Sequence, residues 1–165
     1  MKLSKVKQIK MKVKIKKLHP DAVIPRKGTQ GAAAYDIVAS DNLIIPRGRL
    51  VFPMDFALEI PNGYEVKIEP RSGHSSKGMA GEMFDPKEGK TRYRFDCDVL
   101  TGKIDSDYRG NIGIILHNRD IDFVILKGTA MAQMTFYKVE DVEFTEVDEL
   151  SKTERGKGGY GSTGK

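Results

Sequence analysis

Residues 111–139 read NIGIILHNRDIDFVILKGTAMAQMTFYKV and hold three apolar or alternating runs, at 111–117, 123–126 and 131–139. The runs are separated by Asn118-Arg119-Asp120 and by Lys127-Gly128, which are residue types that favour turns. No run is as long as an ordinary helix, and none keeps an apolar period of 3.6 residues. This stretch therefore predicts three short β-strands joined by tight turns.

The same pattern of short apolar runs separated by turn residues continues towards both ends of the chain. Residues 12–16 alternate lysine with apolar residues, which is typical of a half-buried strand. Further short runs lie at 35–38, 42–45, 50–60, 64–68, 93–99 and 142–147. About ten short strands with turns between them predict an all-β protein, a jelly-roll-like β-sandwich or distorted barrel. Residues 75–91 are polar and charged, and we expect a long loop or a two-strand excursion there.

Charge is unevenly distributed along the 165 residues. The chain carries 28 Lys and Arg against 23 Asp and Glu, but eight of the lysines lie in residues 1–17, which contain no acid. The rest of the chain is therefore mildly acidic, so we expect no nucleic-acid partner, with binding through 1–17 as an alternative. We expect residues 1–10 to be a disordered basic extension of a domain that spans 11–150.

Cysteine count and apolar content exclude several classes of protein. A single cysteine, Cys97, rules out an internal disulfide framework and a cysteine-based zinc site. The longest apolar run, 112–116, is too short to cross a bilayer, so we expect no membrane partner. The lysine-rich start lacks the apolar stretch of a secretory leader, and we expect a cytoplasmic protein, or one of the host cytoplasm if it is viral. Hydrophobic residues make up 39% of the chain, a lean core that burial against other subunits would supplement.

The densest cluster of chemistry-bearing residues is 102–110, Gly-Lys-Ile-Asp-Ser-Asp-Tyr-Arg-Gly. Two carboxylates, Asp105 and Asp107, lie two residues apart beside Tyr108 and an arginine, in a turn between predicted strands. A plain acidic hairpin would not need the aromatic ring and the guanidinium. Asp36 is another carboxylate, set among small residues, and direct metal binding by the three aspartates is an alternative interpretation.

A second segment, Pro70-Arg71-Ser72-Gly73, follows a predicted strand. Its guanidinium, hydroxyl and open glycine amide suit a phosphate group, and the alternative is a plain turn. A nucleophilic role for Ser72 has no elbow motif around it to support it. The three histidines, His19, His74 and His117, are scattered and lack the i, i+4 spacing of a metal site.

The C-terminal segment 151–165 contains five glycines and little that could be buried. Fixing such a segment costs more conformational entropy than its own contacts return, so we expect a mobile arm that orders when it binds a ligand. It fits two glycine-rich phosphate-loop patterns, but both need a following helix, which the sequence does not provide. Arg155, Ser162 and Thr163 are suitable donors for a triphosphate, and Tyr160 offers a ring that could stack on a base.

Taken in order, these segments resemble the five motifs of the homotrimeric dUTP diphosphatases (dUTPases). The matching residues are 31–37, 70–77, 102–110, 128–134 and 155–164, and together the match spans about residues 12–164. The resemblance implies a homotrimeric jelly roll with active sites at subunit interfaces, each closed by a C-terminal arm. It implies hydrolysis of dUTP to dUMP and pyrophosphate with Mg²⁺ as cofactor, which limits uracil incorporation into DNA and supplies dUMP for thymidylate synthesis.

The resemblance also implies a role for each motif residue. Asp105 would orient and deprotonate the attacking water, and Tyr108 would pack against the deoxyribose where a 2′-hydroxyl would clash. The backbone of Gly102, Lys103 and Ile104 would read the uracil edge. The residues that would bind the phosphates or stack over the base are Arg71, Ser72, Gly73, Arg155, Tyr160, Gly161, Ser162 and Thr163. Gln133 would take part in substrate binding by holding the polar network near Asp36, and Asp36 and Asp107 would support the site. Mg²⁺ would be held mainly through the triphosphate and water, with no protein ligand assigned.

Three departures from the family pattern are visible. Ala130 stands where the fourth motif has an arginine, Val99 stands where several bacterial relatives have a uracil-contacting asparagine, and the segment 78–100 is longer than usual. Two other functions are possible for such a chain. A dCTP deaminase of the same fold would need a glutamate near Ile115, and an aliphatic residue cannot do acid–base work. A dUTPase-like signalling or interaction protein would use the insert at 78–100.

Overall fold

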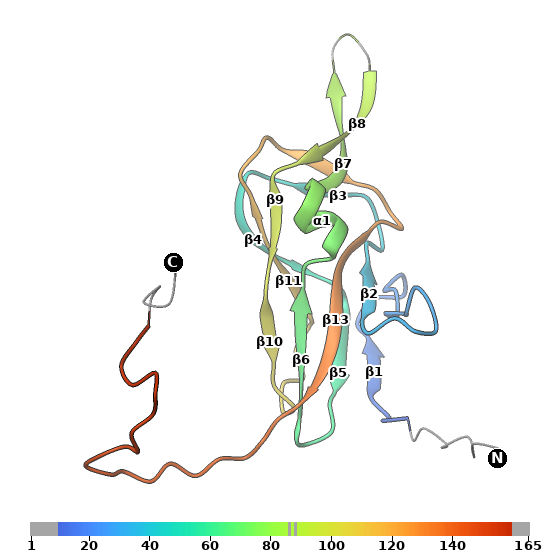
Figure 1. The fold of residues 1–165 in the computed structure, drawn as a ribbon. Coiled ribbons are helices and arrows are strands. Elements are labelled where there is room, and N and C mark those ends of the chain that lie inside the picture. The colour runs from blue at the N-terminus through green and yellow to red at the C-terminus, as the bar shows by residue number, and fades with distance from the viewer. Residues whose placement is uncertain (1–9, 86, 88, 160–165) are drawn as a thin grey trace, which may run out of the picture.

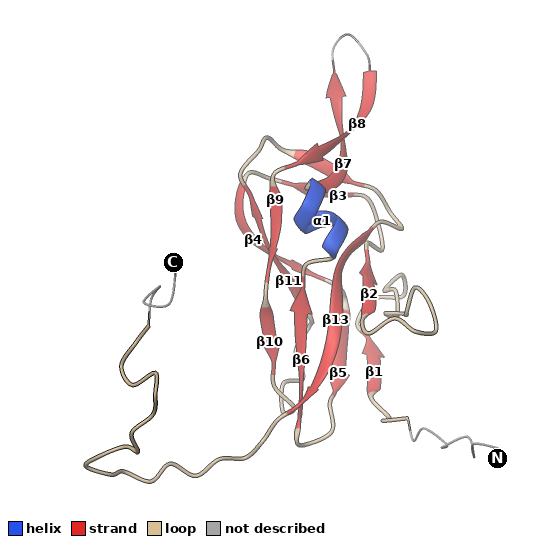
Figure 2. Cartoon of the chain, viewed as in Figure 1, coloured by secondary structure: helices blue, strands red, loops and turns tan. Residues whose placement is uncertain are grey.

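The computed structural model describes residues 10–85, 87 and 89–159. Within those residues the chain forms 13 strands and a single short helix (Figure 1, Figure 2), and the expected all-β, jelly-roll-like fold is confirmed. The strands are β1 (Lys14–Lys17), β2 (Tyr35–Val38), β3 (Leu43–Ile45), β4 (Gly48–Pro53), β5 (Phe56–Glu59), β6 (Tyr64–Glu69), β7 (Met79–Asp85), β8 (Gly89–Phe95), β9 (Cys97–Leu100), β10 (Gly102–Ile104), β11 (Gly113–Asn118), β12 (Phe123–Ile125) and β13 (Ala130–Lys138). The helix α1 covers Ser72–Lys77. Residues 1–9 of the predicted N-terminal extension lie outside the described part.

The strands form four antiparallel sheets. One has the order β10-β6-β13-β2 and another the order β3-β12-β7-β8. The third has the order β4-β11-β9, and β1 pairs with β5. β2 and β13 are far apart in the sequence but are neighbours in the first sheet, which brings the first and fourth motif segments together. β6 lies on the other side of β13 and leads directly into the second motif segment.

A single hydrophobic core lies between the sheets. Ile114 and Leu116 of β11 are fully buried, whereas Ile115 between them is not, so the strand turns one face inwards. The rings of Phe95 and Phe123 stack with centroids 4.1 Å apart and planes at 6°. Val99 also belongs to this core, with 5% of its surface exposed. The residue that stands at the position of the asparagine of the family pattern therefore packs in the core of this chain.

The predicted run 50–60 is interrupted in the structure. β4 ends at Pro53 and β5 begins at Phe56, and Asp55 between them has a φ of 57°. The break is fixed by a distant strand, because Met54 N–H donates to the carbonyl of Ile112, and Ile112 N–H donates to that of Phe56, each at 2.8 Å. A local apolar pattern carries no information about such a partner.

Residues 142–147 form no strand, so that prediction is wrong for the single chain. Val142, Phe144 and Val147 are exposed, Phe144 by 93%. A strand needs partners for its backbone N–H and C=O groups, and within the described residues no other strand pairs with this segment. The chain from β13 onward instead runs away from the body (Figure 1).

The sequence predicted either a long loop or two strands for residues 75–91, and the structure has two strands, β7 and β8. β7 and β8 pair along their whole length and project from the body as a hairpin (Figure 1). The short helix α1 before them was not predicted. It ends at Gly78, which has a φ of 78° and donates its N–H to the carbonyl of His74 at 2.8 Å. α1, the one helix of the described residues, has six residues and is far too short to span a membrane.

Candidate active site

The first candidate cluster lies where β2, β13 and the end of β6 meet. Gln133 pairs with Asp36 on one side and with Glu69 on the other. Directly paired residues of antiparallel strands share a face of the sheet, so these three side chains form a row across its outer face. The second motif segment begins immediately after Glu69, so Arg71 reaches this row from the end of β6.

Arg71 is fixed by an ion pair within this cluster. Its Nε lies 2.9 Å from Oδ1 of Asp36, and its Nη1 donates to the carbonyl of Ala130 at 3.5 Å. Gln133 Nε2 donates to the carbonyl of Pro70 at 3.1 Å. The two charged side chains are about one-third exposed, 37% for Arg71 and 26% for Asp36, so the guanidinium is held in place and still open to an anion.

Two further predicted phosphate ligands follow Arg71 directly. Ser72 and Gly73 are exposed at the start of α1, and a Cβ built on Gly73 would meet nothing within 4 Å. The hydroxyl and the backbone therefore face open space beside the guanidinium. They lie beside Arg71, as the sequence analysis expects for a phosphate-binding segment, and their role in binding stays a prediction.

His74 was not predicted to take part in the site, yet it is the buried residue of α1, with 8% of its surface exposed. Its Nδ1 lies 3.0 Å from the carbonyl oxygen of Met131 on β13. Burial, and next the nearby charge of Arg71, lower the pKa of the imidazole below its ordinary value. Both effects favour the neutral form of the ring. The sequence signal that could have revealed it is the helix stop at Gly78, which indicates a short helical turn over the preceding residues.

The second candidate cluster starts at β10. Within the part of the chain that the structure describes, this strand pairs with β6 alone, so one of its edges is free there. An edge strand presents backbone N–H and C=O groups that no other strand satisfies. Nζ of Lys103 lies 2.6 Å from Oε2 of Glu65 on β6, and this hydrogen bond lowers the pKa of the Glu65 carboxyl. The pair ties β10 to its neighbour across the outer face of the sheet.

The turn after β10 holds the predicted base and the predicted sugar contact. Asp105 and Asp107 are both exposed. Tyr108 N–H donates to the carbonyl of Asp105 at 3.2 Å, and the Tyr108 hydroxyl donates to that of Asn111 at 3.1 Å. Arg109 donates through Nη1 to two carbonyls of its own turn, at 2.6 and 3.0 Å. The arginine thus stabilises the turn, while the carboxylates and the ring of Tyr108, which is 47% exposed, face outward.

One chain does not bring the two clusters together. Ile104 is level with Val66 on β6, whereas Asp36 is level with Glu69, three residues or about 10 Å farther along. β10 and β2 are also the two edges of the sheet, three strand spacings or about 14 Å apart. Direct metal binding by Asp36, Asp105 and Asp107 gains no support, since the described residues contain no group of three or more His, Cys, Asp or Glu that could hold an ion.

The described part of the predicted arm, residues 151–159, lies away from both clusters (Figure 1). Arg155 is exposed and donates through Nε to the carbonyl of Gly158 at 2.9 Å. The remaining predicted arm residues, Tyr160, Gly161, Ser162 and Thr163, lie outside the described residues. Their roles stay predictions.

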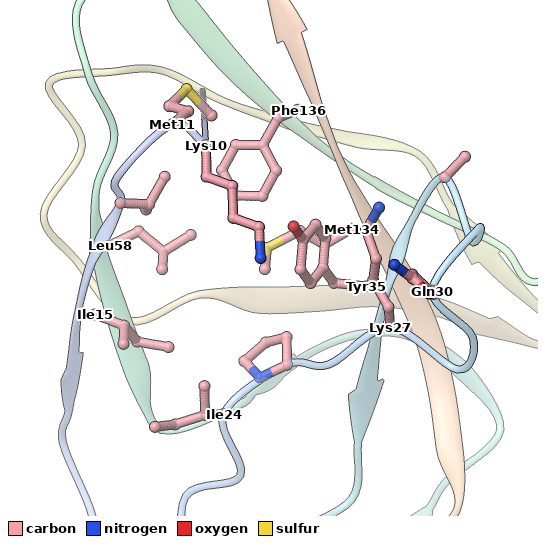
Figure 3. Close-up of a pocket in the computed structure, with 13 residues that line it drawn as sticks. Lys10, Met11, Ile15, Ile24, Lys27, Gln30, Tyr35, Leu58, Met134 and Phe136 are labelled. Carbon is pink, nitrogen blue, oxygen red and sulfur yellow. The ribbon is translucent and has the colours of Figure 1, made fainter. Parts of the chain in front are cut away.

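A separate hollow lies elsewhere in the described part of the chain. It measures about 730 Å³ and lies between the N-terminal segment, the loop before β2, and β13 (Figure 3). Its lining is mainly apolar, with Met11, Ile15, Tyr35 and Phe136 among the side chains. None of the predicted catalytic or binding residues lines it. Tyr35 is next to Asp36 in β2, but successive residues of a strand point to opposite faces.

The sequence is similar to those of known enzymes. A model of the dUTPase family matches residues 20–84 and 86–164. The chain is 42% identical over 157 residues to the deoxyuridine 5'-triphosphate nucleotidohydrolase of Nautilia profundicola, covering 94% of this chain and 100% of that protein. It is 40% identical over 153 residues to the mitochondrial enzyme of that name from Dictyostelium discoideum, covering 92% of this chain and 76% of that protein.

Solved structures share the fold. The dUTPase of Staphylococcus bacteriophage 80alpha, with dUpNHpp bound, has a TM-score of 0.76 and 26% identity, covering 93% of this chain and 98% of that one. A mutant dUTPase from phage phi11 of S. aureus has a TM-score of 0.69 and 23% identity, covering 85% of this chain and 99% of that one. The phi11 structure reveals the coordination of a structural Mg(II) ion.

Proposed function

This chain belongs to the dUTPase family, and from that premise we propose that it hydrolyses dUTP to dUMP and pyrophosphate at a site built by more than one copy of the chain. One observation carries the assignment of the site: an open carboxylate, Asp105, follows directly after the free edge of β10. A strand edge with fixed donors and acceptors can distinguish uracil from cytosine, and a carboxylate beside it can act on a water molecule.

In the proposed reaction Asp105 takes a proton from a water molecule while the water oxygen bonds to the α-phosphorus. The bond from that phosphorus to the oxygen bridging to the β-phosphate breaks, and pyrophosphate leaves with its electron pair. Tyr108 packs against the deoxyribose. Arg71, with Ser72 and Gly73, binds the phosphates. Gln133 donates to the Pro70 carbonyl and pairs with Asp36 across the two strands, and so supports the polar network beside Arg71. Such a reaction depends mostly on positioning and on neutralising charge.

Mg²⁺ is proposed to accompany the triphosphate. Among the described residues no cluster of carboxylates, histidines and cysteines could hold the ion by itself. Mg²⁺ readily keeps several waters and binds through substrate phosphates, so the exposed surface beside Arg71 is compatible with an ion that arrives with dUTP. When bound it would neutralise phosphate charge. The Mg(II) ion of the phi11 enzyme is described as structural.

We propose a homotrimer with shared sites. The predicted base follows β10, whose last residue, Ile104, is level with Val66 of β6. The predicted phosphate ligands begin at Arg71, five residues or about 17 Å farther along β6 and beyond its end. The distance between the two sets supports a site to which a second copy contributes one of them. Val142, Phe144 and Leu150 add a second line of support, because their exposed apolar surfaces need a cover that the described chain does not give. Light scattering should show about three times the 18.4 kDa of one chain. A fully active monomer would overturn the proposal.

The C-terminal arm, residues 151–165, is proposed to close over bound substrate. Arg155 is exposed, and among the described residues its side chain bonds to the Gly158 carbonyl and to no carboxylate. It can therefore be redirected to a phosphate without breaking an ion pair within that part of the chain. We place the enzyme in the cytoplasm, or in that of the host if it is viral. Fractionation of expressing cells followed by immunodetection tests this placement.

The deaminase alternative is disfavoured by the surroundings of Ile115. A Cβ built on Gly102 would lie 3.7 Å from Cδ1 of Ile115, so this side chain faces the start of the proposed base-reading strand. An aliphatic group there cannot move a proton. Release of pyrophosphate measured in parallel with dUTP, UTP, dTTP and dCTP should show activity with dUTP alone.

The role of Asp105 is tested by Asp105→Asn. The amide keeps the shape of the side chain but cannot accept the proton, so turnover should fall by about 10²–10⁴, while binding of the analogue dUpNHpp persists. Asp107→Asn is the matched control, an exposed carboxylate two residues away, and its loss of turnover should be much smaller. If the losses were reversed, the base would be Asp107.

A further inference from the structure

The second motif segment is attached to β13 at an irregular place in that strand. The pairing of β13 with β2 shifts between Ala130, which pairs with Val38, and Ala132, which pairs with Ile37. Met131 is the extra residue of this bulge and is paired with neither β2 nor β6. It is fully buried, so its carbonyl oxygen needs a donor from outside the ladder.

His74 supplies that donor. Its Nδ1 lies 3.0 Å from the Met131 carbonyl oxygen. A carbonyl oxygen can only accept, so Nδ1 carries a hydrogen. In the neutral form of the ring, which burial favours, Nε2 is then the bare nitrogen. The charged groups around the ring are Arg71 before α1, Arg94 on β8 and Asp36 on β2. Two of these three are cations, so a Lys or Arg in place of His74 would be repelled, and a Leu would leave the carbonyl unsatisfied.

The ring is also coupled to the phosphate-binding arginine. His74 N–H donates to the carbonyl of Arg71 at 2.9 Å, so the two residues belong to one turn of backbone. The side chain of Arg71 is held by Asp36 and, at 3.5 Å, by the carbonyl of Ala130. Ala130 and Met131 are adjacent residues of the β13 bulge. The bond from His74 to Met131 therefore fixes the distance between the start of α1 and this bulge, and the Arg71 side chain bonds to the same bulge through Ala130.

We propose that His74 is a positioning residue for substrate binding, which holds Arg71 at the phosphates through its bond to the Met131 carbonyl. This inference rests on the proposed function, in which Arg71 binds the triphosphate. The effect should fall on affinity rather than on the chemical step, because Asp105 lies in the other cluster.

The test compares His74→Leu with His74→Asn. Leu fills the space but donates nothing, whereas the amide nitrogen of Asn occupies the position of Nδ1 and can restore the bond. His74→Leu should raise KM for dUTP by about two- to tenfold, the change expected for one lost hydrogen bond, with kcat almost unchanged. His74→Asn should return KM close to the original value. Calorimetric titration with dUpNHpp should give the same order of affinities.

Two controls keep the outcome decisive. Ser76→Ala removes an exposed side chain of α1 that bonds to the carbonyl of Gly73 at 3.5 Å, and should leave KM unchanged. If His74→Leu does not fold, His74→Gln replaces it, since Gln is polar but places its amide at the Nε2 position. Equal KM values for the Asn variant and for the Leu or Gln variant would overturn the inference, as would a loss confined to kcat. Absence of dUTP hydrolysis in the unmodified protein would refute the proposed function instead.

Discussion

Gly110→Ala should strongly reduce the discrimination between dUTP and UTP while lowering the stability of the fold only slightly. A Cβ at position 110 would collide with the hydroxyl oxygen of Tyr108 and would lie 2.5 Å from Cζ and 3.0 Å from Cε2 of the ring. Carbon atoms pack at about 3.5–4.0 Å, so the ring must retreat by about 1 Å. The φ of Gly110 lies outside the range that favours glycine, and the ring is half exposed, so the backbone stays in place and the ring moves.

The displaced ring should no longer exclude a 2′-hydroxyl. Loss of one steric contact of this size typically reduces discrimination by about 10- to 200-fold, so the ratio of kcat/KM for dUTP over UTP should fall by about that factor. Stability should fall by only about 0.5–1.5 kcal/mol, the worth of the hydrogen bond from Tyr108 to Asn111. Pyrophosphate release with both nucleotides and thermal melting measure the two effects. Tyr108→Phe is the control, since it keeps the ring, and an unchanged ratio in Gly110→Ala would refute the role given to Tyr108.

Three further outcomes are expected. Gly81→Ala should destabilise the fold by about 1–3 kcal/mol through overpacking, because its Cβ would meet the Phe123 ring and lie 2.9 Å from the Val124 carbonyl oxygen, whereas Gly31→Ala, with open space around it, should change the melting temperature little. Folding lowers the pKa of His74, so near the ordinary histidine pKa of about 6.5 the unfolded chain binds more protons than the folded one. The melting temperature of the unmodified protein, relative to that of His74→Asn, should therefore fall as pH drops from 7.5 to 5.5. A difference that stays constant with pH would contradict a buried neutral ring. Truncation after Ser151 should leave the nucleotide-free melting temperature unchanged and lower kcat at saturating dUTP and Mg²⁺ by orders of magnitude, since the arm acts on bound substrate; full turnover would show that the arm has no role.

Local sequence patterns predicted most of the strands because each one has its own period and its own turns. The run 35–38 coincides with β2, and β6, β11 and β12 lie within a residue or two of their predicted bounds. The break at Asp55 was missed because its cause is a pair of hydrogen bonds to Ile112, more than 50 residues away. The strand at 142–147 was predicted wrongly because an alternating pattern does not say whether a partner strand exists in the same chain.

In the candidate site, too, features made by consecutive residues could be predicted from the sequence, and contacts between distant segments could not. The turn with Asp105 and Tyr108 could be predicted because its residues are consecutive, and the structure leaves both exposed. The ion pair between Arg71 and Asp36 joins the first and second motif segments, and spacing alone could not reveal it. The contact of His74 could not be predicted because it depends on a bulge in β13. A histidine that bonds to a backbone carbonyl shows no characteristic spacing to other residues in the sequence.

The shortness of β10 has a consequence for self-association. A free strand edge can recruit an edge from another molecule, and proteins limit this with short strands and with lysine. β10 has three residues, and the central one is Lys103, held by Glu65. A nucleobase needs only two or three backbone groups, whereas a foreign strand needs a longer row to offset the loss of its freedom. The edge can therefore remain open for a small planar ligand without inviting polymerisation, and lengthening it with apolar residues would be expected to cause aggregation before it improved binding.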